Sequence, residues 1–501
     1  MTVAKFQVSK AIHKALSPSH FLLTIIVLTN YMVQYAIEIN LIVNQQGRRH
    51  IEPIANYYLS NSSCIYFNSS QTYRLATISM TRPSIVSIST INLVTCISTA
   101  ISSILLASWS DRYGKRSIYA LISIFGLLCQ AIMAFLTVYG RYNPNLLIYG
   151  SLVLGLTGGL PTFIFSLFAI VGEGCPQKYQ GLQWATLTVC MYIGYAISLQ
   201  MIFRGLSHYN LIVILIICIS IYIISLIFAF IFIHLKYNCS RNDHNVVKKN
   251  LLLDILISFG VTCFTLVRKR KHKLRFRLLL VALVFTVFSY AILTDLVNTY
   301  LVLYPYCWTS ANAYIFESIR LLGIAAGGIL GWLFLRKYLR DSILANIGLT
   351  CVIAPLGMIA LGTPQLWLLF GSIVGGALGG IAVPCMLNMI SKTIKRNEYG
   401  MVFCWIAILY IFGKVISEYM AQRFMILHAN TRSAMIAFAA ANLILLPPKV
   451  FLIFLTCCDK RKEKRQKKEM ETFSVVKDTL SPIDDGILSN DHNSVVSETT
   501  V

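Results

Sequence analysis

The sequence predicts an all-α membrane protein with twelve transmembrane helices in two six-helix halves and both termini cytoplasmic. Composition is the first reason, because 56% of the 501 residues are hydrophobic and only 13% are charged, against roughly a quarter charged in soluble domains. The apolar residues also form runs of about 20, the length at which a helix crosses a bilayer. Finally, Lys and Arg gather in alternate connecting segments, as they do in cytoplasmic loops.

Twelve apolar runs are long enough to span a membrane. The predicted spans are Phe21–Val43, Ile85–Ala107, Ile118–Tyr139, Leu146–Gly172, Leu182–Phe203, Tyr209–Leu235, Leu278–Tyr304, Ala313–Leu335, Ser342–Gly362, Leu366–Ile390, Met401–Arg423 and Ser433–Leu455. An even number of spans agrees with basic segments at both ends of the chain.

The basic segments also divide the chain into parts. We expect residues 1–20 to be a cytoplasmic N-terminus, 21–235 and 278–455 to be the six-helix halves, and 236–277 to be a cytoplasmic loop. The polar, aromatic-poor tail within 456–501 is predicted to be disordered and cytoplasmic. Because the net charge of +23 is spread over short loops between spans, it indicates topology rather than a nucleic-acid partner.

The main ambiguity is Leu251–Val267, an apolar stretch within the central loop. A thirteenth span here would invert the second half. The stretch is short, however, and Asp254, Ser258, Thr262 and Thr265 recur at helical spacing, which makes one polar stripe. With the basic run Arg268–Lys273 after it, the pattern favours a helix lying on the cytoplasmic membrane surface.

The two predicted halves share a weak repeat at a separation of about 220 residues. Its elements are Gly158-Gly159 with Gly379-Gly380, Tyr179-Gln180-Gly181 with Tyr399-Gly400, and Trp109 with Trp332. Glycine pairs are common in packed membrane helices, but the matching order favours a repeat. Two parallel repeats are the architecture of transporters that rock one half against the other.

The segment between the second and third spans is the sharpest motif. It holds Asp111 and the basic residues Arg112, Lys115 and Arg116, and Gly114 permits a tight turn. One interpretation is a simple positive-inside topology signal. The other is a gate, in which Asp111 binds the opposite half in one state of the protein and releases it in another.

This motif and others named below resemble the Major Facilitator Superfamily, whose signature loop reads Gly-x-x-x-Asp-Arg-x-Gly-Arg-Arg. Ala107 replaces its first Gly, and Lys115 replaces the first Arg of its final Arg-Arg pair. The chain is more closely similar to the group containing the proton-coupled folate transporter and the thymic stromal cotransporter. The segments that carry this resemblance are Ser108–Asp111, Tyr304–Trp308, Ala345–Leu349 and Val383-Pro384. The resemblance implies a transporter fold and solute transport.

The chain departs from that group at three positions. Where the folate member carries a Glu, a His and an Arg tied to proton coupling and substrate, the sequence has Thr188, Tyr290 and Leu387. The acidic residue of the seventh span is kept as Asp295. The resemblance therefore carries over transport more directly than it carries over folate as the solute.

Ionisable residues inside predicted spans are the candidate substrate and ion-coupling groups, because a charge in the bilayer is costly and usually paired or functional. They are Asp295, Glu317, Arg320, Lys414 and Glu418. Asp295 and Arg320 are predicted to lie close together in at least one state. The alternative is that these groups are ion pairs that only hold helices together.

The external loops carry the predicted modifications. Asn61 and Asn68 begin glycosylation sequons. The topology leaves Cys64 and Cys307 as the cysteines of the external loops, where an oxidising compartment favours a disulfide over two free thiols. The resemblance agrees, since Cys307 lies in a matched segment. At the other end, Thr499-Thr500-Val501 is typical of a PDZ-domain ligand.

We therefore expect a secondary transporter of a small, anionic organic solute, with protons as a coupling ion. Membrane lipids are the other expected partner, and the plasma membrane or an endolysosomal membrane is the expected location. The alternative is a non-transporting membrane receptor or scaffold that keeps the fold. No nucleophile–base set, metal-ligand cluster or cofactor motif is visible, so neither an enzyme nor a cofactor nor a metal is predicted.

Overall fold

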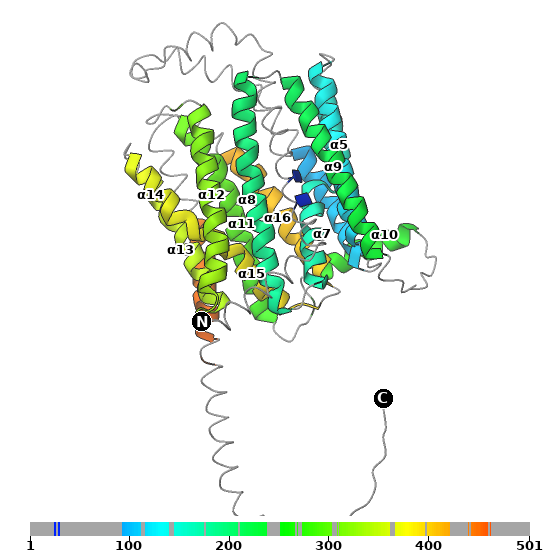
Figure 1. Ribbon diagram of the computed structural model, residues 1–501. Coiled ribbons are helices and arrows are strands. Elements are labelled where there is room, and N and C mark those ends of the chain that lie inside the picture. The colour runs from blue at the N-terminus through cyan, green and yellow to red at the C-terminus, as the bar shows by residue number, and fades with distance from the viewer. Residues whose placement is uncertain are drawn as a thin grey trace, which may run out of the picture. The chain divides into compact units, whose positions relative to one another are not determined.

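The computed structural model describes most of the helical part of the chain (Figure 1). The described residues are 25–26, 29–30, 93–111, 116–139, 145–174, 177–208, 211–237, 251–265, 268, 273–302, 308, 310–360, 366–395, 398–420, 439, 442–458 and 461. The chain divides into two units, Met1–Leu452 and Ile453–Val501. The first unit contains the helical bundle and the candidate functional site.

The described elements are helical, which confirms the predicted all-α membrane fold. No strand occurs in the described ranges. Within them, seven helices are long and apolar enough to cross a membrane: Leu93–Asp111, Ser117–Tyr139, Leu147–Glu173, Tyr179–Met201, Ile212–Ile231, Asn312–Leu335 and Trp367–Ser391. The number of twelve spans and the side of the termini stay predictions, because several predicted spans lie partly or wholly outside the described residues.

The predicted first half is built around one central helix. Its described elements are Leu93–Asp111, α5 (Arg116–Tyr139), α6 (Asn145–Leu156), α7 (Gly159–Gly174), α8 (Gln177–His208) and α9 (Leu211–Tyr237). Helix α5 packs against α6, α7 and α9. Small residues such as Ala131 and Cys218 are buried beside Leu127 and Leu215 in this core, so the helices approach closely, as they must where lipid offers no hydrophobic driving force.

The predicted second half follows a short helix. That helix is α10 (Leu251–Thr265), and after it come α11 (Lys273–Val302), α12 (Ser310–Leu335), α13 (Asp341–Ala360), α14 (Leu366–Gly376), the 3₁₀ turn η2 (Ala377–Ile381), α15 (Ala382–Ser391) and α16 (Tyr399–Met420). The last described helix is Asn442–Cys458. Helix α11 packs against α15 and α16, and α13 packs against α14 and α15.

Two predicted spans are broken at the glycine pairs of the sequence repeat. Leu146–Gly172 is α6 and α7, separated where Gly158 and Gly159 take positive φ values of 81° and 47°. Leu366–Ile390 is α14, η2 and α15, with the second glycine pair in the 3₁₀ turn. Backbone groups freed by such breaks need partners inside a membrane. Local backbone N–H groups bond the Gly155 and Gly379 carbonyls. Hydroxyl groups add a second donor to each: Ser102 donates to Gly155 at 2.5 Å, and Tyr290 donates to Gly379 at 2.5 Å.

Segments of the two predicted halves pack directly on each other. Helix α8 lies beside α12 along the bundle (Figure 1), and α7 lies beside α16. A buried aromatic cluster joins α16 to α7 and α8. Phe403 of α16 is in edge-to-face contact with Phe168 of α7 and Trp184 of α8, at 5.9 and 6.0 Å between ring centroids. Such ring pairs contribute about 0.5–1.5 kcal/mol each beyond the area they bury.

The crossing of α12 and η2 leaves no room for a side chain, which gives a first prediction. A Cβ added to Gly327 would lie 2.2 Å from the Ala377 carbonyl oxygen, whereas one added to Gly371 has nothing within 4 Å. Overpacking of this kind costs about 1–3 kcal/mol. Gly327→Ala should therefore lower the apparent unfolding temperature of the purified protein in detergent, and the matched control Gly371→Ala should not. Equal temperatures for the two variants would contradict the described crossing.

Candidate functional site

Asp111 joins the two predicted halves at their predicted cytoplasmic side. Its Oδ1 accepts a hydrogen bond from the backbone N–H of Gly400 at 3.1 Å, and its Oδ2 accepts one from Met401 at 2.8 Å. These N–H groups belong to the first turn of α16, where no intrahelical acceptor exists. A carboxylate at a helix N-terminus is also favoured by the helix dipole. Asp111 therefore caps a helix that lies 289 residues further along the chain.

Glycine makes this contact possible. A Cβ on Gly400 would lie 2.7 Å from Asp111 Oδ1 and 2.8 Å from the Ser110 hydroxyl. The preceding residue, Tyr399, lies over Gly172 of α7, where an added Cβ would meet the ring at 2.5 Å. Any side chain at these glycines would push the halves apart.

A second close approach has its glycine in the predicted first half and its aromatic ring in the second. Gly181, at the start of α8, lies against the ring of Trp332, and a Cβ there would come within 2.2 Å of it. The Arg336 guanidinium lies 4.4 Å from the Trp332 ring centroid. Asp341 then accepts hydrogen bonds from Asn388 at 2.8 Å and Lys392 at 2.7 Å. The repeat pairs Gly181 with Gly400 and Trp332 with Trp109, so each half contributes one glycine and one motif.

Glu317 and Arg320 form a buried ion pair within α12. Arg320 Nε donates to Glu317 Oε2 at 2.7 Å, and Arg320 Nη2 donates to Glu317 Oε1. Both side chains are almost fully removed from the surface. Burying two charges is costly unless their geometry is excellent, and this bidentate contact provides it. The described partner of Arg320 is thus Glu317, a residue of the same helix.

Tyrosines from other helices surround Arg320. Tyr192 and Tyr195 of α8 lie within electrostatic range of its guanidinium, and Tyr290 of α11 lines a cavity beside it. This cavity has a volume of about 10 Å³, which is barely the space that one water molecule requires. Arg320 is therefore buried between the halves, and the described cavity beside it is too small for an organic solute in this conformation.

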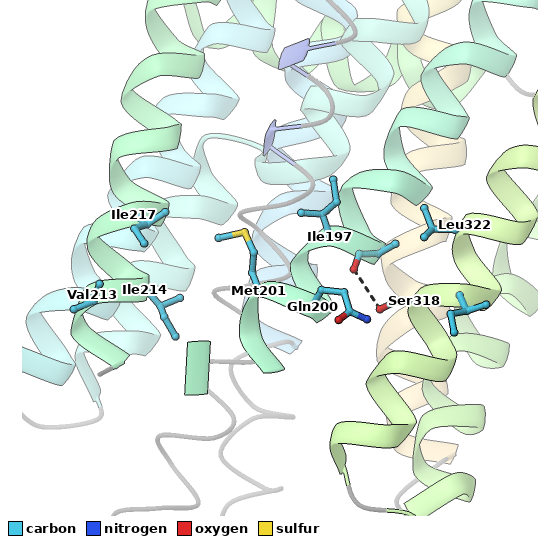
Figure 2. Close-up of a pocket in the computed structure, with 10 residues that line it drawn as sticks. Ile197, Gln200, Met201, Val213, Ile214, Ile217, Ser318 and Leu322 are labelled. Carbon is cyan, nitrogen blue, oxygen red and sulfur yellow. Dashed lines mark hydrogen bonds between the residues drawn. The ribbon is translucent and has the colours of Figure 1, made fainter. Parts of the chain in front are cut away.

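A larger groove of about 660 Å³ lies on the opposite face of α12 (Figure 2). Helices α8, α9 and α12 line it, with Ile197, Val213 and Leu322 among its apolar side chains. Gln200 and Ser318 are its polar residues, and the Ser318 hydroxyl also bonds the Ala196 carbonyl at 3.3 Å. An apolar groove on membrane-spanning helices does not suit an anion, so the candidate solute site is the Arg320 side of α12.

The three positions at which the sequence departs from the folate transporter group have different surroundings. The Thr188 hydroxyl donates to the backbone carbonyl of Trp184 in its own helix at 2.7 Å, and Leu387 is fully buried in α15. Tyr290 lies on the Arg320 cavity and has a ring centroid 6.4 Å from that of Tyr192. Among these three, Tyr290 is the residue placed to influence a bound solute.

The structure leaves the other predicted site residues without side-chain detail. Asp295 lies in α11, Lys414 and Glu418 lie in α16, and Arg116 begins α5, but their side chains are not described. The remaining predicted residues lie outside the described part of the chain: Arg112, Gly114, Lys115, Asn61, Cys64, Asn68 and Cys307. The proximity of Asp295 to Arg320, the disulfide and the glycosylation sites therefore stay predictions.

Sequence reasoning missed two groups. Asp341 and its partners were overlooked because Arg336 to Arg340 resembled a plain basic loop, although an acidic residue directly before a helical run signals a helix start. The tyrosines around Arg320 come from separate helices, so no local spacing relates all of them. Only Tyr192 and Tyr195, three residues apart on one helix face, offered a signal.

Comparison with known proteins identifies the family. A profile of the Major Facilitator Superfamily matches residues 20–418. The chain belongs to this superfamily and is an integral membrane protein of a transporter fold. The membership confirms the resemblance inferred from the Asp111 motif.

Two curated relatives show where in the superfamily the chain lies. It is 24% identical over 323 residues to the lysosomal proton-coupled steroid conjugate and bile acid symporter SLC46A3 of Homo sapiens, covering 63% of this chain and 68% of that protein. It is 23% identical over 312 residues to the proton-coupled folate transporter of Bos taurus, covering 61% of this chain and 65% of that protein. The matches span about two thirds of each relative.

Solved structures share the fold. The human organic anion transporter MFSD10 (TETRAN) aligns with a TM-score of 0.64 at 15% identity, covering 87% of this chain and 100% of that chain. The proton:xylose symporter XylE aligns with a TM-score of 0.58 at 11% identity, covering 87% of this chain and 95% of that chain. At these identities the likeness concerns the fold alone.

The Asp111 contact yields a second prediction. Asp111→Asn keeps one acceptor oxygen but loses the charge, and hydrogen bonds to charged groups are stronger than neutral ones by about 1 kcal/mol. The predicted cytoplasmic side should open several-fold more often. Cys404, buried in α16 one turn beyond Gly400, should then be alkylated faster by a membrane-permeant maleimide, as read by mass spectrometry of the purified protein.

Gly400→Ala should have the same effect without changing any charge, because its methyl group displaces the Asp111 carboxylate. Gly375→Ala, which has open space around its Cβ, is the matched control. Unchanged Cys404 alkylation in both Asp111→Asn and Gly400→Ala would reduce the motif to a topology signal.

Proposed function

We propose that the protein is a secondary active transporter that moves a small organic anion by alternating access, with protons as the coupling ion. One observation carries this proposal: the buried Glu317–Arg320 pair on α12, next to α8 of the other predicted half. Ionisable groups inside a membrane bundle usually mark a substrate or proton pathway.

Arg320 supplies the recognition of the anion. Its planar guanidinium matches carboxylate, sulfate or phosphate groups in two-pronged geometry. The aromatic rings of Tyr192 and Tyr290 flank this region and would pack against the apolar body of an organic solute. Such sites combine mostly apolar walls with a few polar groups that fix orientation.

Glu317 supplies the proton coupling. In this structure it is the counter-ion of the Arg320 guanidinium. A proton that binds Glu317 removes its charge, and the buried Arg320 then favours a new anionic partner. A solute anion and a proton therefore bind together, each raising the affinity of the other, as linkage requires.

Alternating access would then follow from the contacts on the predicted cytoplasmic side. Asp111 and the glycine contacts hold the two predicted halves together there, and release of these contacts would open the site to the cytoplasm. Asp295, Lys414 and Glu418 are further candidates for coupling, because they too are ionisable residues of predicted spans.

The relatives support the same proposal by their names. SLC46A3 and the folate transporter are both described as proton-coupled, and their named solutes include steroid conjugates, bile acids and folate. MFSD10 is described as an organic anion transporter. A plasma-membrane or endolysosomal location and a PDZ-domain partner at Thr499-Thr500-Val501 complete the proposal.

Uptake by purified protein in liposomes tests the proposed proton-coupled anion transport. The assay uses a panel of organic anions that includes folate and a steroid conjugate, with and without an inward proton gradient. Glu317→Gln imitates the protonated carboxyl, so it should still exchange anions but lose proton-driven accumulation. Accumulation that still follows the proton gradient in Glu317→Gln would remove Glu317 from the mechanism, and the absence of uptake for every anion would favour the receptor or scaffold alternative.

A companion set of variants tests the pairing itself. Arg320→Gln leaves the buried carboxylate without its partner, a change that costs about 3–5 kcal/mol in soluble proteins. The double variant Glu317→Gln/Arg320→Gln should be more stable than Arg320→Gln alone but equally unable to bind anions. Lys337→Gln, which removes a charge from an exposed position just beyond α12, is the control and should change neither property.

A further inference from the structure

Helix α10 contacts both predicted halves through a single residue. The Thr262 side chain is fully buried, and its hydroxyl donates to the Ile104 carbonyl of the helix that ends at Asp111, at 3.1 Å. The carbonyl of Thr262 accepts a hydrogen bond from the Trp405 indole of α16 at 3.2 Å. Thr262 thus bridges the two segments that Asp111 also joins.

Neighbouring residues strengthen this inner face of α10. The Thr265 hydroxyl contacts Met401 Sδ at 3.5 Å, and Met401 is one of the two residues whose N–H Asp111 accepts. Just beyond the helix, Arg268 Nη1 bonds Glu398 Oε1 at 2.9 Å. The polar stripe predicted from the sequence is therefore directed, at Thr262 and Thr265, toward the protein rather than toward water.

A stripe beside this inner face of α10 is apolar and open. Ile257, Val261 and Phe264 are exposed, Phe264 to 66%, and a Cβ on Gly260 between them would meet nothing within 4 Å. Their spacings of four and three residues place them on one stripe of the helix. An exposed apolar stripe of this kind marks an interaction surface.

Charge and position indicate what covers this stripe. The sequence from Arg268 to Lys273 is basic, and α11 begins at Lys273 and leads into a predicted span. Helix α10 lies at the lower end of the bundle in Figure 1, against two helices of the membrane-spanning unit. An apolar helix face beside a basic run at a membrane boundary fits the anionic phospholipids of the cytoplasmic leaflet.

We propose that α10 is a lipid-dependent latch: its exposed apolar stripe and the cations Arg268 and Lys273 bind the anionic cytoplasmic leaflet, while Thr262, Thr265 and the Arg268–Glu398 ion pair hold the predicted cytoplasmic side closed. Bilayer contact keeps α10 seated on Ile104 and Trp405. Loss of anionic lipid releases it and permits the Asp111 contact to open. Leaflet composition would thereby bias the conformation, whatever solute the protein carries.

Hydrogen exchange of the full-length protein in nanodiscs tests the latch without any solute. One set of discs contains phosphatidylcholine alone, and the other contains phosphatidylcholine with phosphatidylserine. Phosphatidylserine should slow exchange in peptides from 251–265 and from 398–405, the two sides of the contact. Equal exchange in both lipids would overturn the proposal and leave the exposed apolar stripe to a protein partner.

Matched variants separate the lipid contact from the contact with the bundle. Phe264→Gln should abolish the slowing by phosphatidylserine, whereas Phe334→Gln, which removes an equally exposed phenyl (65%) at the end of α12, should keep it. Arg268→Gln should weaken the lipid effect about fivefold, the value of one cation near an anionic surface. Glu398→Gln breaks the same ion pair but keeps the cation, so it should retain the lipid effect on 251–265. Equal behaviour of Phe264→Gln and Phe334→Gln, or of Arg268→Gln and Glu398→Gln, would contradict the latch.

Discussion

The carboxylate of Asp111 and the N-terminus of α16 are complementary, and the described contacts between the two predicted halves are arranged around them. Asp111 presents two acceptor oxygens. The first turn of α16 presents two N–H groups that have no acceptor within that helix. Because the bond length fixes how near the segments lie, Gly172 and Gly400 must lack side chains. The aromatic cluster of Phe168, Trp184 and Phe403 and the seat of α10 on Met401 depend on the same placement.

A repeated architecture produces a second close approach of the predicted halves at a glycine. Gly181 meets Trp332 as Gly400 meets the segment after Trp109, and both broken spans divide at a glycine pair. Contacts made of hydrogen bonds and close backbone approach are lost abruptly when helices separate, so they suit an interface with two discrete states. The buried Glu317–Arg320 pair lies between these halves, where such a change of state would alter its exposure. The proposed solute site and the Gly181–Trp332 contact share helices α8 and α12.

The sequence predicted the helical membrane fold, the family and the Asp111 motif, because hydropathy, loop charge and a short signature are local properties of the chain. It also indicated the glycine repeat, although not that each pair divides a span. It did not reveal the partner of Arg320, since Glu317 on the same helix and Asp295 on the preceding one were equally compatible with the spacing. The tyrosines near Arg320 and the direction of the α10 stripe depend on how distant helices meet, and no local pattern encodes that. Six residues of the gate and coupling sets stay untested at the side-chain level: Arg112, Lys115, Arg116, Asp295, Lys414 and Glu418.

The distance between the two predicted halves is the most direct test of this account. Spin labels at Gln177, at the start of α8, and at Tyr338, exposed to 78% just beyond α12, report that distance by pulsed electron paramagnetic resonance in nanodiscs. The account predicts a short-distance population that matches the closed contact and a longer one that grows in Asp111→Asn. A single distance distribution, identical with and without the Asp111 carboxylate, would contradict the claim that this carboxylate holds the halves together.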